Sequence, residues 1–89
     1  MPIQLDYTVI ATYEPSFAVV IVPKPILNDT AAAEQTRVYL EQQYFRLPTV
    51  LMARDDRGVP NAYYGRGDLA IPLSRVALAG RPWEHMMLG

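Results

Sequence analysis

The chain has 89 residues, of which 51% are hydrophobic and 19% are charged, and its net charge is -1. Because so short a chain supports one hydrophobic core, we expect a single domain over residues 1–89, and its balanced charge argues against nucleic acid as a partner. The absence of cysteine excludes disulfides, thiolate catalysis and thiolate metal sites.

The N-terminal region is not typical of a signal peptide, because no basic segment precedes an apolar one. The longest apolar run begins at Phe17 and is far shorter than the roughly 20 residues that a membrane-spanning helix requires. These features predict a soluble, cytoplasmic protein with no membrane partner.

Two strands are predicted first along the chain. Apolar and polar residues alternate over residues 3–13, with Ile10 as the exception, which is typical of a strand buried on one face. After a break at residues 14–16, residues 17–22 form a continuous apolar run that predicts a strand covered on both faces. Together they predict a hairpin whose second strand is the more central.

A long helix is predicted after a stretch that contains two prolines. Pro23 and Pro25 predict an extended surface segment over residues 23–27, since neither can donate to a strand ladder. Several residues just before position 31 can cap a helix, and residues 31–45 contain no glycine or proline. We therefore expect a helix there, ended by Pro48.

The second half of the chain predicts three strands and a short helix. Residues 49–53 and 59–64 are strands joined by a polar turn over residues 54–58, and Pro60 places the later one at a sheet edge. A turn at residues 65–67, a short helix over residues 69–76 and a last strand over residues 83–88 follow.

The element order, strand-strand-helix-strand-strand-short helix-strand, predicts an α+β two-layer sandwich: a mixed sheet of four or five strands with one main helix. This order is similar to that of ubiquitin-like β-grasp folds. A thioredoxin-like fold is the alternative, because LPTVLM, residues 47–52, resembles the strand after the cis-proline of that family. The chain lacks that family's cysteine pair and first βα unit, so this resemblance implies no redox chemistry.

The predicted helix has two apolar stripes when its residues are placed about 100° apart. The core-facing stripe consists of Ala33, Leu40, Tyr44 and Leu47. A second stripe, with a seven-residue spacing on the other side, consists of Ala31, Val38 and Phe45. Between them, a solvated ion-pair ladder is expected at Glu34, Arg37 and Glu41. Either the C-terminal segment covers the second stripe, or a second copy of the chain does; the surplus of apolar residues favours a homodimer or a complex with another protein.

Few residues are candidates for chemistry. The one histidine, His85, has no second imidazole to complete a metal site, and Asp55 and Asp56 are typical of a hairpin turn. Neither serine lies in a Gly-x-Ser-x-Gly setting, and residues 65–67 lack the spacing of a nucleotide-binding loop. The sequence predicts no metal and no cofactor.

One alternative is a proton-transfer enzyme. Met1, Pro2 and Ile3 resemble the start of tautomerase-superfamily chains, in which an exposed N-terminal proline acts as general base. The resemblance implies that Pro2 would have this role. It covers three residues, and a second strand separates the first strand from the helix, unlike in that family.

Another alternative concerns the stretch NAYYGRGDLAIP, residues 61–72, which we interpret as a corner in the backbone. Gly65 and Gly67 would permit backbone angles that other residues avoid. Tyr63, Tyr64 and Arg66 could instead bind a ligand or a peptide. The favoured prediction remains a small non-enzymatic association module.

Overall fold

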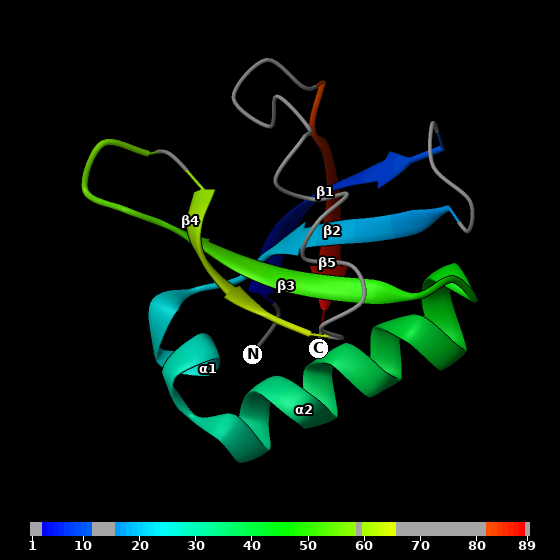
Figure 1. The fold of residues 1–89 in the computed structure, drawn as a ribbon, viewed down its shortest axis with the longest axis horizontal. Helices are drawn as coiled ribbons and strands as arrows, with labels where there is room; N and C mark the ends of the chain where they lie inside the picture. Colours follow the sequence, from blue (N-terminus) through cyan, green and yellow to red (C-terminus); the bar gives the residue numbers. More distant parts are fainter. Residues whose placement is uncertain (1–2, 12–15, 59, 66–81, 89) are drawn as a thin grey trace.

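The computed structural model describes residues 3–11, 16–58, 60–65 and 82–88, and its helices lie on one face of a sheet (Figure 1). Within these ranges the strands are β1 (Ile3–Ile10), β2 (Phe17–Ile21), β3 (Thr49–Arg54), β4 (Pro60–Tyr64) and β5 (Glu84–Leu88). The helical segments are α1 (Lys24–Asn28), α2 (Thr30–Tyr39) and the π-helical turn η1 (Leu40–Phe45). The predicted α+β sandwich is confirmed. None of the helices described is long and apolar enough to cross a membrane.

The sheet is mixed, with the strand order β4-β3-β2-β1-β5. Strands β2 and β3 are parallel, because the helices carry the chain back across the sheet, and the other neighbours are antiparallel. Strand β2 lies in the middle and all five of its residues are buried, as its continuous apolar run predicts. The short helix expected over residues 69–76 lies outside the described residues, so the full β-grasp-like order stays a prediction.

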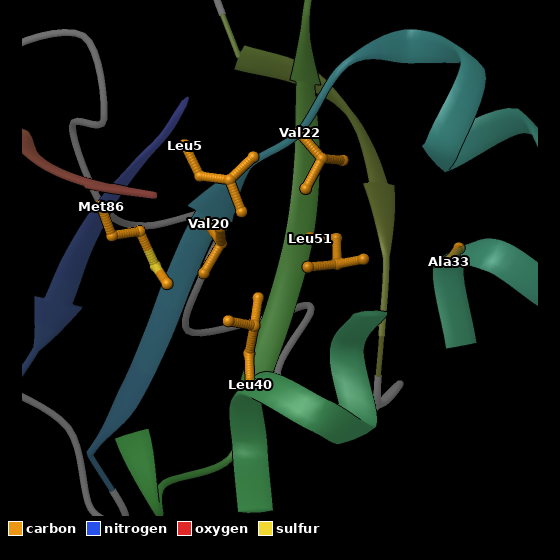
Figure 2. Close-up of a cluster of buried hydrophobic side chains, with 7 residues drawn as sticks. All are labelled: Leu5, Val20, Val22, Ala33, Leu40, Leu51 and Met86. Carbon is orange, nitrogen blue, oxygen red and sulfur yellow. The ribbon is translucent and has the colours of Figure 1, made fainter. Parts of the chain in front are cut away.

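Side chains from alternate positions of the strands form two core clusters, one on each face of the sheet. The first core cluster, on the face away from the helices, contains Ile10, Phe17, Val19, Ile21, Val50 and Met52. The second core cluster, beneath the helices (Figure 2), contains Leu5, Val20, Val22, Ala33, Leu40, Leu51 and Met86. Ile10 breaks the alternation of its strand because it belongs to the first cluster, whereas Leu5 belongs to the second.

Residues 24–28 form helix α1, so the extended segment expected from the two prolines is wrong. Proline is tolerated in the first turn of a helix, where the backbone N–H groups have no helical partner, and Pro25 occupies that turn. The carbonyl of Pro23 accepts hydrogen bonds from the backbone N–H groups of Ile26 and Leu27, at 3.0 and 3.3 Å. Both apolar side chains pack against the second core cluster, which stabilises the turn.

The main helix begins at an Asp cap and ends in a wider turn. Asp29 Oδ1 accepts hydrogen bonds from the N–H groups of Ala31 and Ala32, at 3.1 and 3.2 Å. From Leu40 the helix is π-helical, with more residues per turn, so the 100° spacing no longer gives the direction of a side chain. Phe45 accordingly packs against the second core cluster, and Tyr44, expected to face the core, is half-exposed.

The charged residues of the helix form the expected ion pairs and also a hydrogen bond to strand β3. Arg37 pairs with Glu34 at 2.8 Å and with Glu41 at 3.1 Å, as predicted, but the Arg37 side chain is only 13% exposed. Glu41 Oε1 also accepts a hydrogen bond from the backbone N–H of Thr49 at 3.0 Å. This carboxylate therefore connects η1 to the first residue of β3.

The β3–β4 connection confirms the turn predicted for Asp55 and Asp56. Asp55 Oδ1 accepts a hydrogen bond from the N–H of Arg57 at 2.9 Å, and the Asp55 carbonyl accepts one from Gly58 at 3.0 Å. Gly58 has a φ of 78°, which favours glycine. Pro60 begins the edge strand β4, as expected.

Gly65 lies in a bend directly after β4, and close packing rather than an unusual backbone angle requires glycine there. A Cβ at this position would lie 2.9 Å from Val50 Cγ1 and 3.2 Å from Val50 Cα, and Val50 is completely buried. We expect Gly65→Ala to lower the free energy of unfolding by about 1–3 kcal/mol. Denaturant titrations monitored by circular dichroism would measure this change.

A double mutant separates this contact from a general effect of the substitution. In a Val50→Ala background, Gly65→Ala should cost clearly less than in the native chain, because the nearest atom that the new Cβ meets, Val50 Cγ1, has been removed. An equal cost in both backgrounds would contradict the packing explanation.

Candidate functional site

Three polar side chains meet on the sheet face away from the helices, and we call them the charged cluster: Asp6, Arg54 and His85. Asp6 Oδ1 lies 2.6 Å from His85 Nδ1, and Asp6 Oδ2 lies 2.9 Å from Arg54 Nη2. The central carboxylate thus uses both oxygens, one for each neighbour.

The strand register brings these residues together. Asp6 in β1 is the cross-strand partner of His85 in β5, so both side chains point to the same face. On the other side of β1, Ile21 pairs with Asp6 and also with Met52. Arg54, two residues beyond Met52, extends its side chain across β2 to reach the carboxylate.

Asp6 is held in its ionised form. Burial opposes ionisation, but the hydrogen bonds from His85 and Arg54 outweigh it and lower the pKa of Asp6 below its usual value. An ionised carboxylate only accepts hydrogen bonds, so Nδ1 of His85 is the donor in this pair. In the neutral imidazole, the other ring nitrogen, Nε2, is then an acceptor. The His85 side chain is 63% exposed and that of Asp6 only 19%, so the carboxylate is largely sheltered while the ring meets solvent.

Arg54 is itself fixed from a second direction. Its guanidinium lies 5.8 Å from the centre of the Trp83 ring, within the range of a cation–π interaction. Trp83 packs against the first core cluster. The charged cluster is therefore anchored to the core on its Arg54 side.

An open recess of about 600 Å³ adjoins the charged cluster, and Asp6 and Arg54 form part of its wall. Further polar groups around it include Gln4, Lys24 and Asp56, and Lys24 Nζ lies 3.6 Å from Asp56 Oδ1. This volume is in the range of small-molecule sites.

A second surface lies on the outer side of the main helix, and we call it the outer helix face: Gln35, Val38, Tyr39 and Gln42. A shallow recess of about 410 Å³ is lined by these four residues together with Glu34 and Gln43. Tyr39 is 52% exposed and Val38 is half-buried. Among the residues that the structure describes, Glu34 is the one charged residue that lines this recess, and its carboxylate is paired with Arg37 at 2.8 Å.

The three residues predicted for an interface have different environments. Ala31 is exposed, Val38 lies on the outer helix face, and Phe45 packs against the second core cluster and the ring of Tyr7, with centroids 5.1 Å apart. The wider turn η1 separates Phe45 from the other two. Their role in an interface stays a prediction.

The C-terminal residues lie within the sheet layer. Strand β5 pairs with β1, and Met86 reaches the second core cluster next to Leu5 and Leu40 (Figure 2). Trp83 packs on the opposite face of the sheet. Neither Met86 nor Trp83 lines the recess of the outer helix face. Phe45 of the second stripe, however, packs against the cluster that contains Met86, so the choice between the two covers of that stripe stays a prediction.

The predicted binding residues of strand β4 are not brought together. Tyr63 packs against the first core cluster and Tyr64 against the second, so the two rings point to opposite faces of the sheet. Arg66 lies outside the described residues, as do Pro2 and Gly67. A ligand site at Tyr63, Tyr64 and Arg66 stays a prediction.

Sequence reasoning did not identify Asp6 and Arg54 as the neighbours of His85. Asp6 and His85 are 79 residues apart, and only the register of β1 with β5 joins them. Tyr39 was also missed, although the run of uncharged residues at helical spacing is visible in the sequence. No protein-family model, curated protein or solved structure matches the chain.

Proposed function

We propose that the chain is a small association module that forms a homodimer in the cytoplasm through its outer helix face. The observation that carries this proposal is the half-exposed Tyr39 beside Val38, in a recess whose charged lining residue, Glu34, is already paired with Arg37. Large aromatic residues next to shallow apolar recesses are enriched at protein interfaces.

The chemistry of this face favours a second copy of the chain as the partner. Glutamine side chains both donate and accept hydrogen bonds, so Gln35 and Gln42 of two identical faces can satisfy each other. A twofold interface brings the same patch of both subunits together, and a patch whose carboxylate is already paired with an arginine does so with little repulsion. A face with Lys or Arg at its centre would instead indicate an acidic partner.

The first test is the mass in solution. Light scattering at micromolar concentration should give about twice 10.0 kDa for the native chain. Tyr39→Glu should weaken dimerisation by about 30-fold or more, because an interface hot spot contributes at least about 2 kcal/mol and the new carboxylate would be buried without a partner.

Ala11→Glu is the matched control. It adds the same charge at an exposed position just beyond β1 that is not one of the residues of the outer helix face. This variant should retain the mass of the native chain. A native mass of one subunit would refute the proposal, and equal effects of the two substitutions would assign the interface to another surface.

A further inference from the structure

We propose that His85, positioned by Asp6 and Arg54, is a catalytic base that hydrolyses small esters. This activity goes beyond self-association and differs from the non-enzymatic role that the sequence favours. It rests on the geometry of the charged cluster and does not require the dimer.

The hydrogen bond to Asp6 determines which nitrogen of the His85 ring carries the proton. With Nδ1 donating to Asp6 at 2.6 Å, the lone pair of Nε2 is directed away from the carboxylate. The ring is exposed on the sheet surface, so Nε2 is accessible to water and to a small molecule. A base must be accessible and in the correct tautomer to remove a proton.

Asp6 also stabilises the positive charge that develops on the imidazole during the reaction. When Nε2 takes a proton, the ring becomes a cation, and the adjacent carboxylate of Asp6 stabilises it. Arg54 holds the second oxygen of that carboxylate at 2.9 Å and so fixes its orientation. Asp6 and Arg54 are therefore positioning residues, and His85 is the catalytic residue.

The substrate class follows from the residues beside the imidazole. Met87 lies two positions after His85 on the same face of β5 and is 61% exposed, which offers an apolar contact for an acyl or aryl group. Its cross-strand neighbour Gln4 is also exposed and can donate a hydrogen bond to a carbonyl oxygen. An ester with a short apolar group matches this combination.

In the proposed reaction, Nε2 removes a proton from a water molecule as the water oxygen bonds to the ester carbonyl carbon. The bond from that carbon to the leaving oxygen then breaks, and its electron pair stays on the leaving oxygen. The imidazolium returns the proton to this oxygen. The products are a carboxylic acid and an alcohol, and His85 regains its starting form.

The experiment uses p-nitrophenyl acetate with the full chain, measured at steady state after amines have reacted. The chain has one histidine and no cysteine, so any imidazole-dependent turnover belongs to His85. The native rate should exceed that of free imidazole at the same concentration, and His85→Ala should lower it by about 10²-fold. A native rate no higher than that of free imidazole would overturn the proposal, as would a His85→Ala rate equal to the native one.

Two further variants separate positioning from folding. Asp6→Asn should lower the rate by about tenfold and change the pH profile, and it should alter the ¹⁵N shifts of the single imidazole, because the stabilising carboxylate is lost. Asp29→Asn removes the same charge at the helix cap, where Asn is an equally good cap, and should leave rate and spectrum unchanged. If both variants hydrolyse the ester at the native rate, Asp6 does not position His85 and the proposal fails.

Discussion

Replacing Phe17 with alanine is expected to lower the free energy of unfolding by about 3–5 kcal/mol. Phe17 is fully buried in the first core cluster, at the start of the central strand β2. Its removal leaves a cavity that the surrounding strands can fill only in part. A domain of this size has a total stability of roughly 5–10 kcal/mol, so the variant would lose a large part of it.

Urea titrations monitored by circular dichroism would measure the change. Met87→Ala is the control, because this apolar side chain is exposed and its loss should change stability by no more than about 0.5 kcal/mol. A Phe17→Ala variant as stable as the control would show that the sheet face away from the helices is not a core.

We expect Leu40→Ala to cost about 2–5 kcal/mol. Leu40 is fully buried beneath the helices, where it packs among residues of β1, β2, β3 and β5 in the second core cluster (Figure 2). It is also the first residue of the π-helical turn, so it fixes the end of the main helix on the sheet. Thermal and denaturant unfolding should both show the loss.

The control for Leu40→Ala is Thr30→Ala. Thr30 is exposed at the other end of the helix, so its substitution should lower the free energy of unfolding by no more than about 0.5 kcal/mol. All variants should be studied at one protein concentration, because association raises apparent stability. Similar costs for the two substitutions would mean that Leu40 does not hold the helix to the sheet.

Much of the sheet could be predicted because each strand carries a local signal. The continuous apolar run at residues 17–21 is specific to a strand covered on both faces, and Pro60 marks an edge strand. The sequence predicts secondary structure less well where the same residues are compatible with two conformations. Pro23 and Pro25 are compatible with an extended chain and with a first helical turn, and the packing of Ile26 and Leu27 against the second core cluster favours the helical turn.

In the main helix, prediction from the sequence fails for a different reason. The prediction of which helix residues face the core assumes a constant rotation per residue. It is correct for Ala33 and Leu40, which are both buried. The prediction fails after Leu40, because the sequence contains no local pattern that indicates a π-helical turn. Tyr44, expected to face the core, is therefore half-exposed, and Phe45, expected on the second stripe, packs against the core.

The charged cluster was beyond prediction from the sequence for a topological reason. Asp6 belongs to an alternating strand in which polar residues are expected to face solvent, and nothing in its neighbourhood points to His85. The pairing requires that β5 lie next to β1 and in one register. A shift by one residue would turn His85 to the other face of the sheet.

Strand β5 follows the other described strands in the chain but pairs with the first, β1. During translation, a nascent chain that has already formed β1 to β4 lacks Met86 in its core and has no imidazole beside Asp6. The proposed ester hydrolysis would therefore begin only after β5 has left the ribosome and paired with β1, and a chain terminated before β5 would lack it.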